Sequence, residues 1–153
     1  PTSTEQVLHP DRYAAKDAPT DVIFTGARVD TVQYEDNLGA FETRLLFQQH
    51  LNNEAEAELL SEGWDGDRYQ VLGPMADALV WYSVWDDVAA ATRFARGLER
   101  AWAKRRSGGP SDRRSEIKQL TIDGRPAVRL VDAPASWKGW RALPTVRLSA
   151  ASD

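Results

Sequence analysis

The chain has no cysteine and only 2 histidines and 1 methionine among its 153 residues. The absence of cysteine excludes disulfides, thiolate zinc sites and a cysteine nucleophile. No apolar run approaches the roughly 18 residues that a membrane-spanning helix needs, so no transmembrane segment is expected. The hydrophobic share of 42% is enough for about one domain with a core of its own.

Metal sites are not expected either. A catalytic zinc ion takes three protein ligands, usually with a close pair on one helix, whereas His9 and His50 stand far apart. Asp65 and Asp67 could offer oxygen ligands to calcium, but Ala76 occupies the position where an EF-hand loop requires glutamate. We therefore expect a helix-to-strand turn in which the two aspartates accept local backbone hydrogen bonds.

No set of residues for catalysis is complete. Asp86 and Asp87 stand directly before a periodic helical stretch, which favours capping of that helix over acid–base chemistry. There is no G-x-S-x-G sequence, and the SGGP stretch at 107–110 lacks the lysine of a phosphate-binding loop. The sequence predicts a protein that is not an enzyme and binds no cofactor.

Charge is divided unevenly along the chain. Residues 1–92 carry 5 Lys or Arg against 17 Asp or Glu, and residues 93–153 carry 14 against 6, within a net charge of −4. The two halves either neutralise each other across the fold or form an electrostatically polarised molecule. The basic stretch 93–114 would attract nucleic acid, but it lacks a stacking motif, so no nucleic-acid partner is expected.

Apolar spacing predicts the central elements. Over 29–36 the alternation places Val32 and Tyr34 on the inner face of a strand. Asn37 is a suitable N-cap for a following helix, in which Phe41 and Leu45 continue an apolar stripe. Another helix is expected over 54–60, followed by a strand hairpin that turns at Gly73-Pro74.

The second half repeats this alternation of helix and strands. Its apolar residues recur at steps of three and four, which predicts a helix that ends in a cluster of cations. A hairpin with an Asp-Gly turn follows. The order predicts an α+β fold of the ferredoxin-like β-α-β-β-α-β type, with both helices on one face of an antiparallel sheet and an extra hairpin strand. The helix is marked by Val88, Ala91, Ala95, Leu98 and Trp102, and the turn by Asp123-Gly124.

Three segments are expected: an N-terminal anchor over 1–20, the ferredoxin-like domain over 21–132, and an irregular tail with two tryptophans over 133–153. The other face of the sheet would be left open or covered by a partner.

Several blocks carry a family resemblance. In order along the chain they are TSTEQVLHPDRY (2–13), DNLGAF (36–41), GWDGDRY (63–69), LVW (79–81) and VWD (84–86). Together they resemble the C-terminal region of exported bacterial and archaeal proteins related to zinc metallopeptidases, a group that includes an archaeal surface-protein family. The His-Glu-x-x-His motif of that family is missing, so the resemblance implies an extracytoplasmic location (periplasm or cell surface) and transfers no active residue.

Contact with a partner is expected at two places. One is the basic end of the second helix, and the other is the tryptophan pair of the tail, because arginine and tryptophan often anchor protein interfaces. The residues are Arg100, Lys104, Arg105, Arg106, Trp137 and Trp140.

The sequence thus favours a non-catalytic, extracytoplasmic interaction domain, either an accessory subunit or an appended domain, that docks on a larger protein assembly. Association of that assembly with a membrane stays open. Two alternatives remain: a C-terminal fragment of a zinc-peptidase-like protein whose catalytic region lies upstream, and a small-ligand-binding module that uses the open sheet face.

Overall fold

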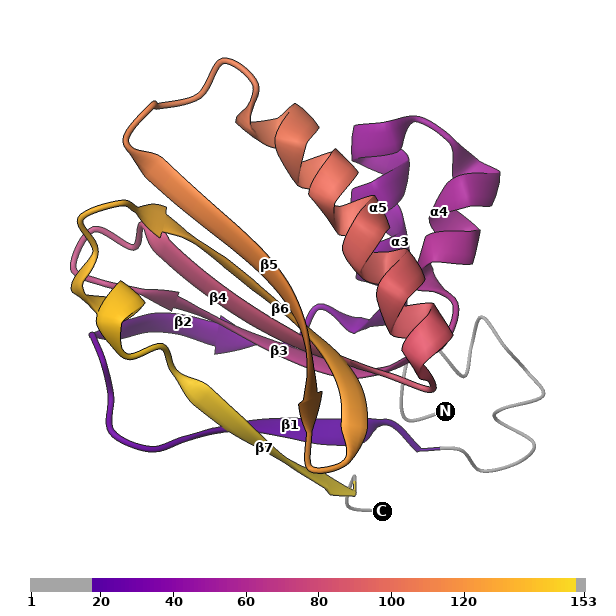
Figure 1. Ribbon diagram of the computed structural model, residues 1–153, viewed down its shortest axis with the longest axis horizontal. Coiled ribbons are helices and arrows are strands. Elements are labelled where there is room, and N and C mark those ends of the chain that lie inside the picture. The colour runs from indigo at the N-terminus through magenta and orange to yellow at the C-terminus, as the bar shows by residue number, and fades with distance from the viewer. Residues whose placement is uncertain (1–17, 151–153) are drawn as a thin grey trace.

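The computed structural model describes residues 18–150 as three α-helices and two antiparallel sheets (Figure 1). Strands β2, β3, β4, β6 and β5 form, in this spatial order, a five-stranded sheet, while β1 and β7 form a separate two-stranded ribbon. The α+β class is confirmed. In chain order the elements are β1 (Thr20–Thr25), β2 (Val32–Asp36), α3 (Gly39–Leu51), α4 (Glu54–Ser61), β3 (Trp64–Leu72), β4 (Ala78–Trp85), α5 (Val88–Arg106), β5 (Arg113–Ile122), β6 (Arg125–Pro134), the 3-10 helix η1 (Lys138–Arg141) and β7 (Thr145–Ala150).

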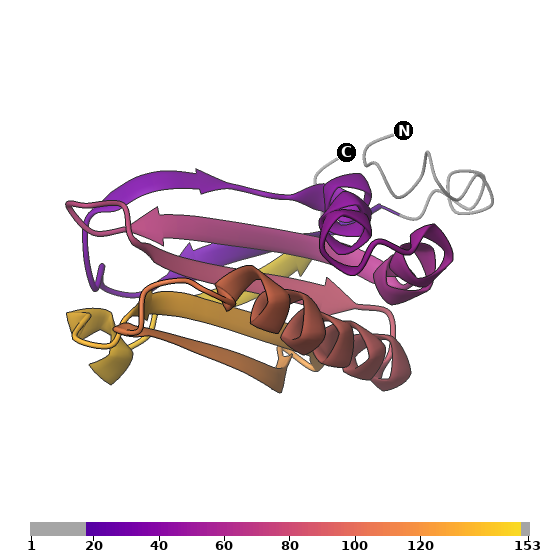
Figure 2. The same ribbon diagram turned by 90° about the horizontal axis from the view of Figure 1, so that it is seen from above.

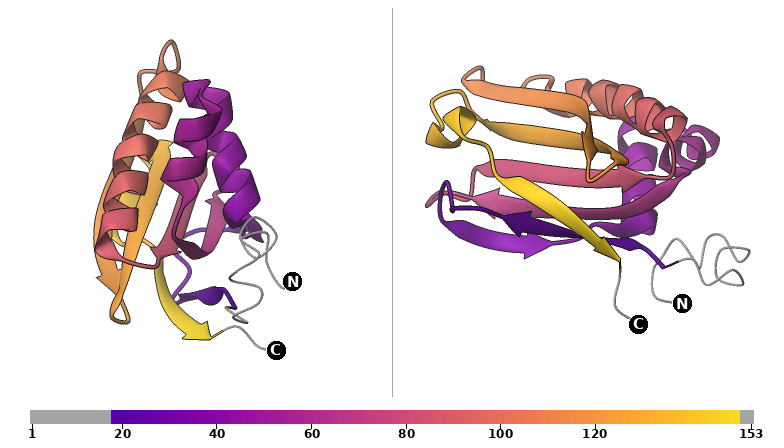
Figure 3. Two further views of the ribbon diagram at one scale, coloured as in Figure 1. Left: turned by 90° about the vertical axis from the view of Figure 1, so that its right-hand side faces the viewer. Right: turned by 60° about the horizontal axis from the view of Figure 1, so that its bottom comes forward.

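The molecule has three layers. Helices α3, α4 and α5 lie on one face of the five-stranded sheet, and the β1–β7 ribbon lies on the other (Figures 1 and 3). Seen from the helix side, the helices cover one half of the length of the strands (Figure 2). The other half carries no helix above it.

The ferredoxin-like sheet order is not confirmed. In that fold the strands that flank a helix run parallel with another strand between them, but β2 and β3 are antiparallel neighbours. The reason is that the connection contains two helices. The chain leaves the sheet along α3, turns back at Asn52, which has a left-handed φ of 52°, and returns along α4. It therefore enters β3 at the end of the sheet where β2 finished.

Helix α3 begins at a carboxylate from another element. Asp67 of β3 accepts hydrogen bonds from the backbone N–H groups of Leu38 (2.7 Å) and Gly39 (2.9 Å), and no side chain caps the helix from within. The predicted cap at Asn37 is therefore wrong. Asp67 is buried, and its third donor is the indole Nε1 of Trp81 at 2.9 Å.

This anchoring also sets which side of α3 is buried. The buried residues are Gly39, Ala40, Thr43 and Phe47, whereas Phe41 and Leu45 of the predicted stripe are exposed. Tyr34, predicted to face inward, is 54% exposed. Strand β2 has an irregular register between Val32 and Tyr34, and a bulge of this kind shifts the side chains that follow it to the other face.

The core on the helix side is centred on an aromatic cluster. Phe94 of α5 stacks on Trp85 at 4.3 Å between ring centroids and meets Trp81 and Phe47 edge to face at 5.7 and 5.6 Å. Edge-to-face and offset-stacked geometries are those that aromatic rings prefer. The periodicity of α5 is confirmed at Ala91, Ala95, Leu98 and Trp102, which are buried, but not at Val88, which is exposed.

The opposite face of the sheet is covered by the chain itself. Val22 and Phe24 of β1 with Val146 and Leu148 of β7 pack on a second apolar cluster around Val80, Tyr82, Val84 and Val131. The Tyr82 hydroxyl donates to the backbone oxygen of Pro144 at 2.5 Å. The sequence predicts that this face is open or covered by a partner, but the ribbon of β1 and β7 covers it. The two strands come from distant parts of the chain, so local patterns did not reveal this cover.

The expected segments change accordingly. Strand β6 runs to Pro134, and η1 and β7 lie in the stretch predicted as an irregular tail. Strand β1 begins at Thr20 and pairs with β7 from Thr20↔Ala150 to Thr25↔Thr145. The N-terminal anchor lies, up to residue 17, outside the described residues.

Replacing Asp67→Asn should lower the free energy of unfolding by about 1–3 kcal/mol. The amide NH2 takes the place of one carboxylate oxygen, and each N–H group that donated to that oxygen is left without an acceptor. Urea unfolding at mildly acidic pH measures this. The exposed Asp112→Asn is the control and should change it by less than about 0.5 kcal/mol. Equal effects of the two substitutions would contradict the capping role.

Asp67 also predicts a pH dependence. Burial raises the pKa of this carboxyl above its ordinary value of 3.8, although its hydrogen-bond donors act in the opposite direction. Between 3.8 and the higher folded pKa, the folded state binds more protons than the unfolded state, so the contribution of Asp67 is complete below pH 3.8 and is lost as pH rises through the folded pKa. The stability advantage of the unaltered protein over Asp67→Asn should therefore shrink with rising pH. A constant or growing advantage in a pH series of urea unfolding would be inconsistent with this shift.

The ribbon depends on a glycine. A Cβ at Gly66 of β3 would lie 2.1 Å from the backbone oxygen of Thr20 in β1, so β1 would have to move away. Gly66→Ala should therefore destabilise by about 1–3 kcal/mol, the range for overpacking. Gly124→Ala is the control: nothing lies within 4 Å of its Cβ, and it carries only the left-handed backbone cost of about 1 kcal/mol. Thermal unfolding should rank Gly66→Ala as the more damaging change, and the reverse order would show that the close approach has no cost.

Candidate functional site

A cleft of about 610 Å³ opens on the helix side of the sheet, between the C-terminal end of α5 and the strands. Cavities of this size are typical of binding sites for organic ligands and side chains. The lining residues come from α3 and its N-cap, β3, the β3–β4 turn, β4, α5, the loop before β5, β5 and β6: Leu38, Leu46, Tyr69, Val71, Ala76, Asp77, Ala78, Leu79, Trp81, Trp102, Arg105, Arg106, Gly109, Pro110, Arg113 and Asp132.

The floor of the cleft is apolar. Leu79 of β4 and Tyr69 of β3 are half-buried side chains at the edge of the helix-side core, and Leu46 of α3 packs against the same core. Burial raises the pKa of the Tyr69 hydroxyl, so the phenol is neutral at pH 7. These surfaces can accept an aliphatic or aromatic group.

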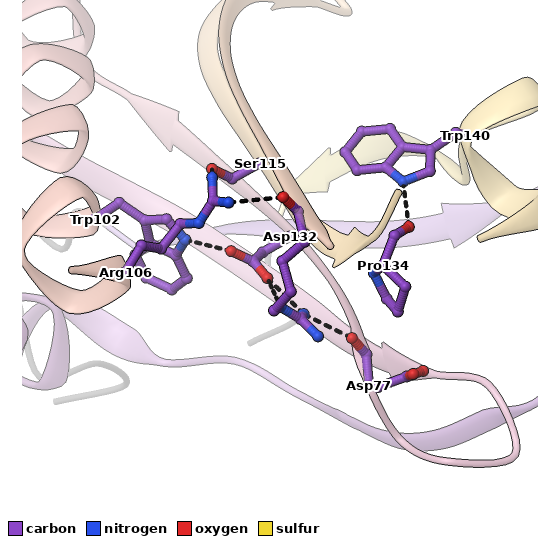
Figure 4. A network of polar contacts seen from close by, with 8 residues as sticks. Asp77, Trp102, Arg106, Ser115, Asp132, Pro134 and Trp140 are labelled. Carbon is purple, nitrogen blue, oxygen red and sulfur yellow. Dashed lines mark hydrogen bonds and ion pairs between the residues drawn. The ribbon is translucent and has the colours of Figure 1, made fainter. Parts of the chain in front are cut away.

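One wall is held by an ion pair between the buried Asp132 and the partly exposed Arg113. Asp132 of β6 accepts from the Nε of Arg113 and from the indole Nε1 of Trp102, both at 2.7 Å. Arg113 also donates to the backbone oxygen of Asp77 at 2.7 Å. This group joins α5, the β3–β4 turn and the β5–β6 hairpin, with the Trp102–Asp132 contact at its centre (Figure 4). Asp132 therefore neutralises the charge of Arg113.

At the same wall, the charges of Arg105 and Arg106 are not neutralised by a carboxylate of the described residues. Arg106 donates only to neutral oxygens, the Ser115 hydroxyl and the Arg113 carbonyl, at 2.7 Å each. The guanidinium of Arg105 lies over the Trp102 ring, 4.8 Å from its centroid. Within residues 18–150 no carboxylate forms an ion pair with Arg105 or Arg106.

The nearest polar groups do not cancel this charge. Asp77 lines the cleft, but its carboxylate is turned toward the β3–β4 turn beside Gly73. Burial and the charge of Arg105 lower the pKa of His50, so its imidazole is neutral at pH 7. The cleft therefore combines an apolar floor with a rim that attracts anions.

Of the four cations predicted to bind a partner, two line the cleft and two do not. Arg105 and Arg106 line the cleft. Arg100 pairs with Glu56 of α4, and Lys104 is exposed and does not line the cleft. Arg100–Glu56 is one of the contacts that join the acidic and basic halves of the chain, as are Arg125–Asp65 and Lys138–Asp30.

The predicted tryptophan anchors lie on the other side of the sheet and belong to the core. Trp137 is 8% exposed, and its Nε1 donates to Asp30 at 3.1 Å. Trp140 is half-buried and donates to the Pro134 carbonyl at 2.9 Å, with the Arg114 guanidinium 4.1 Å from its ring centroid. They pack on the chain's own sheet and do not share a surface with the arginines.

The other acidic candidates have structural roles. Asp65 accepts from the Thr20 hydroxyl at 2.6 Å and from Arg125 at 2.7 Å, so it ties β3 to β1 and β6 through long-range contacts. Asp87, and not Asp86, caps α5 by accepting from the Ala90 N–H at 2.8 Å. Among residues 18–150 no three His, Asp or Glu side chains gather as a metal site would require.

Sequence reasoning did not find the floor of the cleft. Tyr69, Val71 and Leu79 look like ordinary apolar residues of a strand, and only the short cover of helices over the sheet turns them into a binding surface. The one usable signal was the cation cluster at the end of α5.

Comparison with known proteins adds one finding. No curated protein and no solved structure matches the chain. In the described part of the chain no helix has both the length and the apolar character to cross a membrane. A family model with the description "Domain of unknown function (DUF8575)" matches residues 27–139, from the loop before β2 into η1. Since that match covers more than half of the chain, the protein belongs to the DUF8575 family.

Proposed function

We propose that this chain is a non-catalytic interaction domain of a larger extracytoplasmic assembly and that it docks on its partner through the cleft beside α5. The observation that carries the proposal is the cleft itself, which joins an apolar floor to two arginines without a carboxylate partner among the described residues. The extracytoplasmic location is supported by the resemblance of the sequence blocks to exported proteins.

The parts of the sheet that are already covered support this position for the docking surface. The ribbon closes one face of the sheet, and Trp137 and Trp140 pack with the apolar cluster on that same face. The helices close half of the other face (Figure 2). The cleft lies in the remaining half, where apolar strand residues are still accessible next to the exposed Met75 of the β3–β4 turn.

Site-specific photo-crosslinking tests this function. A benzoylphenylalanine placed at Leu79, on the cleft floor, should give one discrete adduct in the envelope fraction of the source cells. The same group at the exposed Lys118 of the edge strand β5 is the control and should give none, because it lies outside the cleft. An excess of the unaltered chain should suppress the adduct, while an excess of the Leu79→Glu chain should not.

Two kinds of crosslinking result would contradict the proposed function. If Leu79 and Lys118 gave the same adducts, or if Leu79→Glu competed as well as the unaltered chain, the cleft would not be the docking surface. An adduct found only in the cytosolic fraction would contradict the extracytoplasmic location.

A further inference from the structure

The rim of the cleft has an uneven charge that its occupant must match. Arg113 is neutralised by Asp132, whereas Arg105 and Arg106 meet only an indole ring and neutral oxygens in the described part of the chain. A guanidinium group offers five N–H donors in one plane and matches a carboxylate with two parallel hydrogen bonds. An occupant with carboxylates is therefore favoured over a neutral or cationic one.

The geometry of the two arginines favours more than one carboxylate. The exposed Arg105 lies over the Trp102 ring, while Arg106 is turned toward Ser115 on β5. The two side chains leave the helix in different directions, since consecutive residues of a helix do not share a face. A ligand with a single acid group can meet one of them, but a chain with several acids can meet both.

The floor adds a requirement for an apolar side chain. Leu79, Tyr69 and Leu46 present apolar surface inside the cleft. Burial of such surface contributes a favourable binding free energy of at most about 25 cal/mol per Å². Charge at the rim sets the specificity and rate of association more than the affinity. A tight occupant therefore needs an anchor in the cleft as well as acids at its edge.

We propose that the cleft binds an extended, acidic segment of a partner protein, in which an aromatic or branched aliphatic side chain enters the floor and neighbouring carboxylates reach Arg105 and Arg106. This inference rests on the proposed function and names the chemistry of the partner. It gives the last turn of α5 two roles, since its cations also complement the helix dipole.

A defined peptide tests this chemistry. A fluorescein-labelled Gly-Glu-Phe-Glu-Leu-Glu-Gly peptide should bind in fluorescence anisotropy, and the peptide with Gln in place of each Glu should bind at least about tenfold more weakly. Arg105→Glu should weaken binding of the acidic peptide about tenfold, because attraction becomes repulsion. The matched control is Lys104→Glu, which makes the same charge change one residue away from the cleft lining and should cost less than about threefold, since salt screens exposed charges beyond about 8 Å.

A second readout uses the unaltered protein, so the test does not depend on any variant folding. The NMR signal of the indole N–H of Trp102, which is fixed on Asp132 at 2.7 Å, should shift more with the acidic peptide than with the same concentration of the Gln peptide. Three results would each overturn the proposal. They are equal NMR shifts with both peptides, equal losses of affinity for the Arg105 and Lys104 variants, and displacement of the peptide by equimolar dodecanoate. A cleft adduct in the crosslinking experiment without any preference for acid would overturn this inference alone, whereas the absence of that adduct would contradict the proposed function.

Discussion

Strand β4 carries large side chains on both of its faces, and the rest of the structure depends on covering both. Trp81 and Trp85 belong to the helix-side cluster, while Val80, Tyr82 and Val84 belong to the cluster under the ribbon. Each such side chain gains about 1.5–3 kcal/mol from full burial, so a single covering layer would leave one set of them in water. The ribbon is therefore as necessary to the fold as the helices, and its closeness at Gly66 is what lets it cover the second face.

Local signals in the sequence located most elements but not their pairing. The steps of three and four along α5 and the Asp123-Gly124 turn between β5 and β6 identify structures that neighbouring residues determine. The pairing of β1 with β7 joins Thr25 to Thr145, and the sequence of neither strand indicates with which strand it pairs. The ferredoxin-like order failed for a related reason: apolar spacing showed two helical stretches, but not that α3 and α4 form a hairpin that returns the chain to the end of β2.

The same limit applies to the candidate site. Clustered cations are visible in a sequence, which is why Arg105 and Arg106 could be named in advance. Burial of a tryptophan in an irregular stretch follows no period, so the sequence alone predicts a partner contact for Trp137, which lies in a core. The residues of the cleft floor were missed because exposure of a strand residue depends on how far the helices extend over it, and this is set by packing between distant segments.

The ion pair between the buried Asp132 and the partly exposed Arg113 gives the cleft its fixed wall. Burial of the Asp132 charge is costly, and an ion pair of this kind contributes little net stability compared with apolar residues of the same size. Its effect lies in position: one carboxylate orients the Trp102 ring, and Arg113 ties the β5–β6 hairpin to the β3–β4 turn through the Asp77 carbonyl. Arg105 in turn lies on the Trp102 ring, so the guanidinium that faces a ligand is held before the ligand arrives. A side chain that is already ordered loses less entropy on binding, and this preorganisation favours binding of a ligand at the rim.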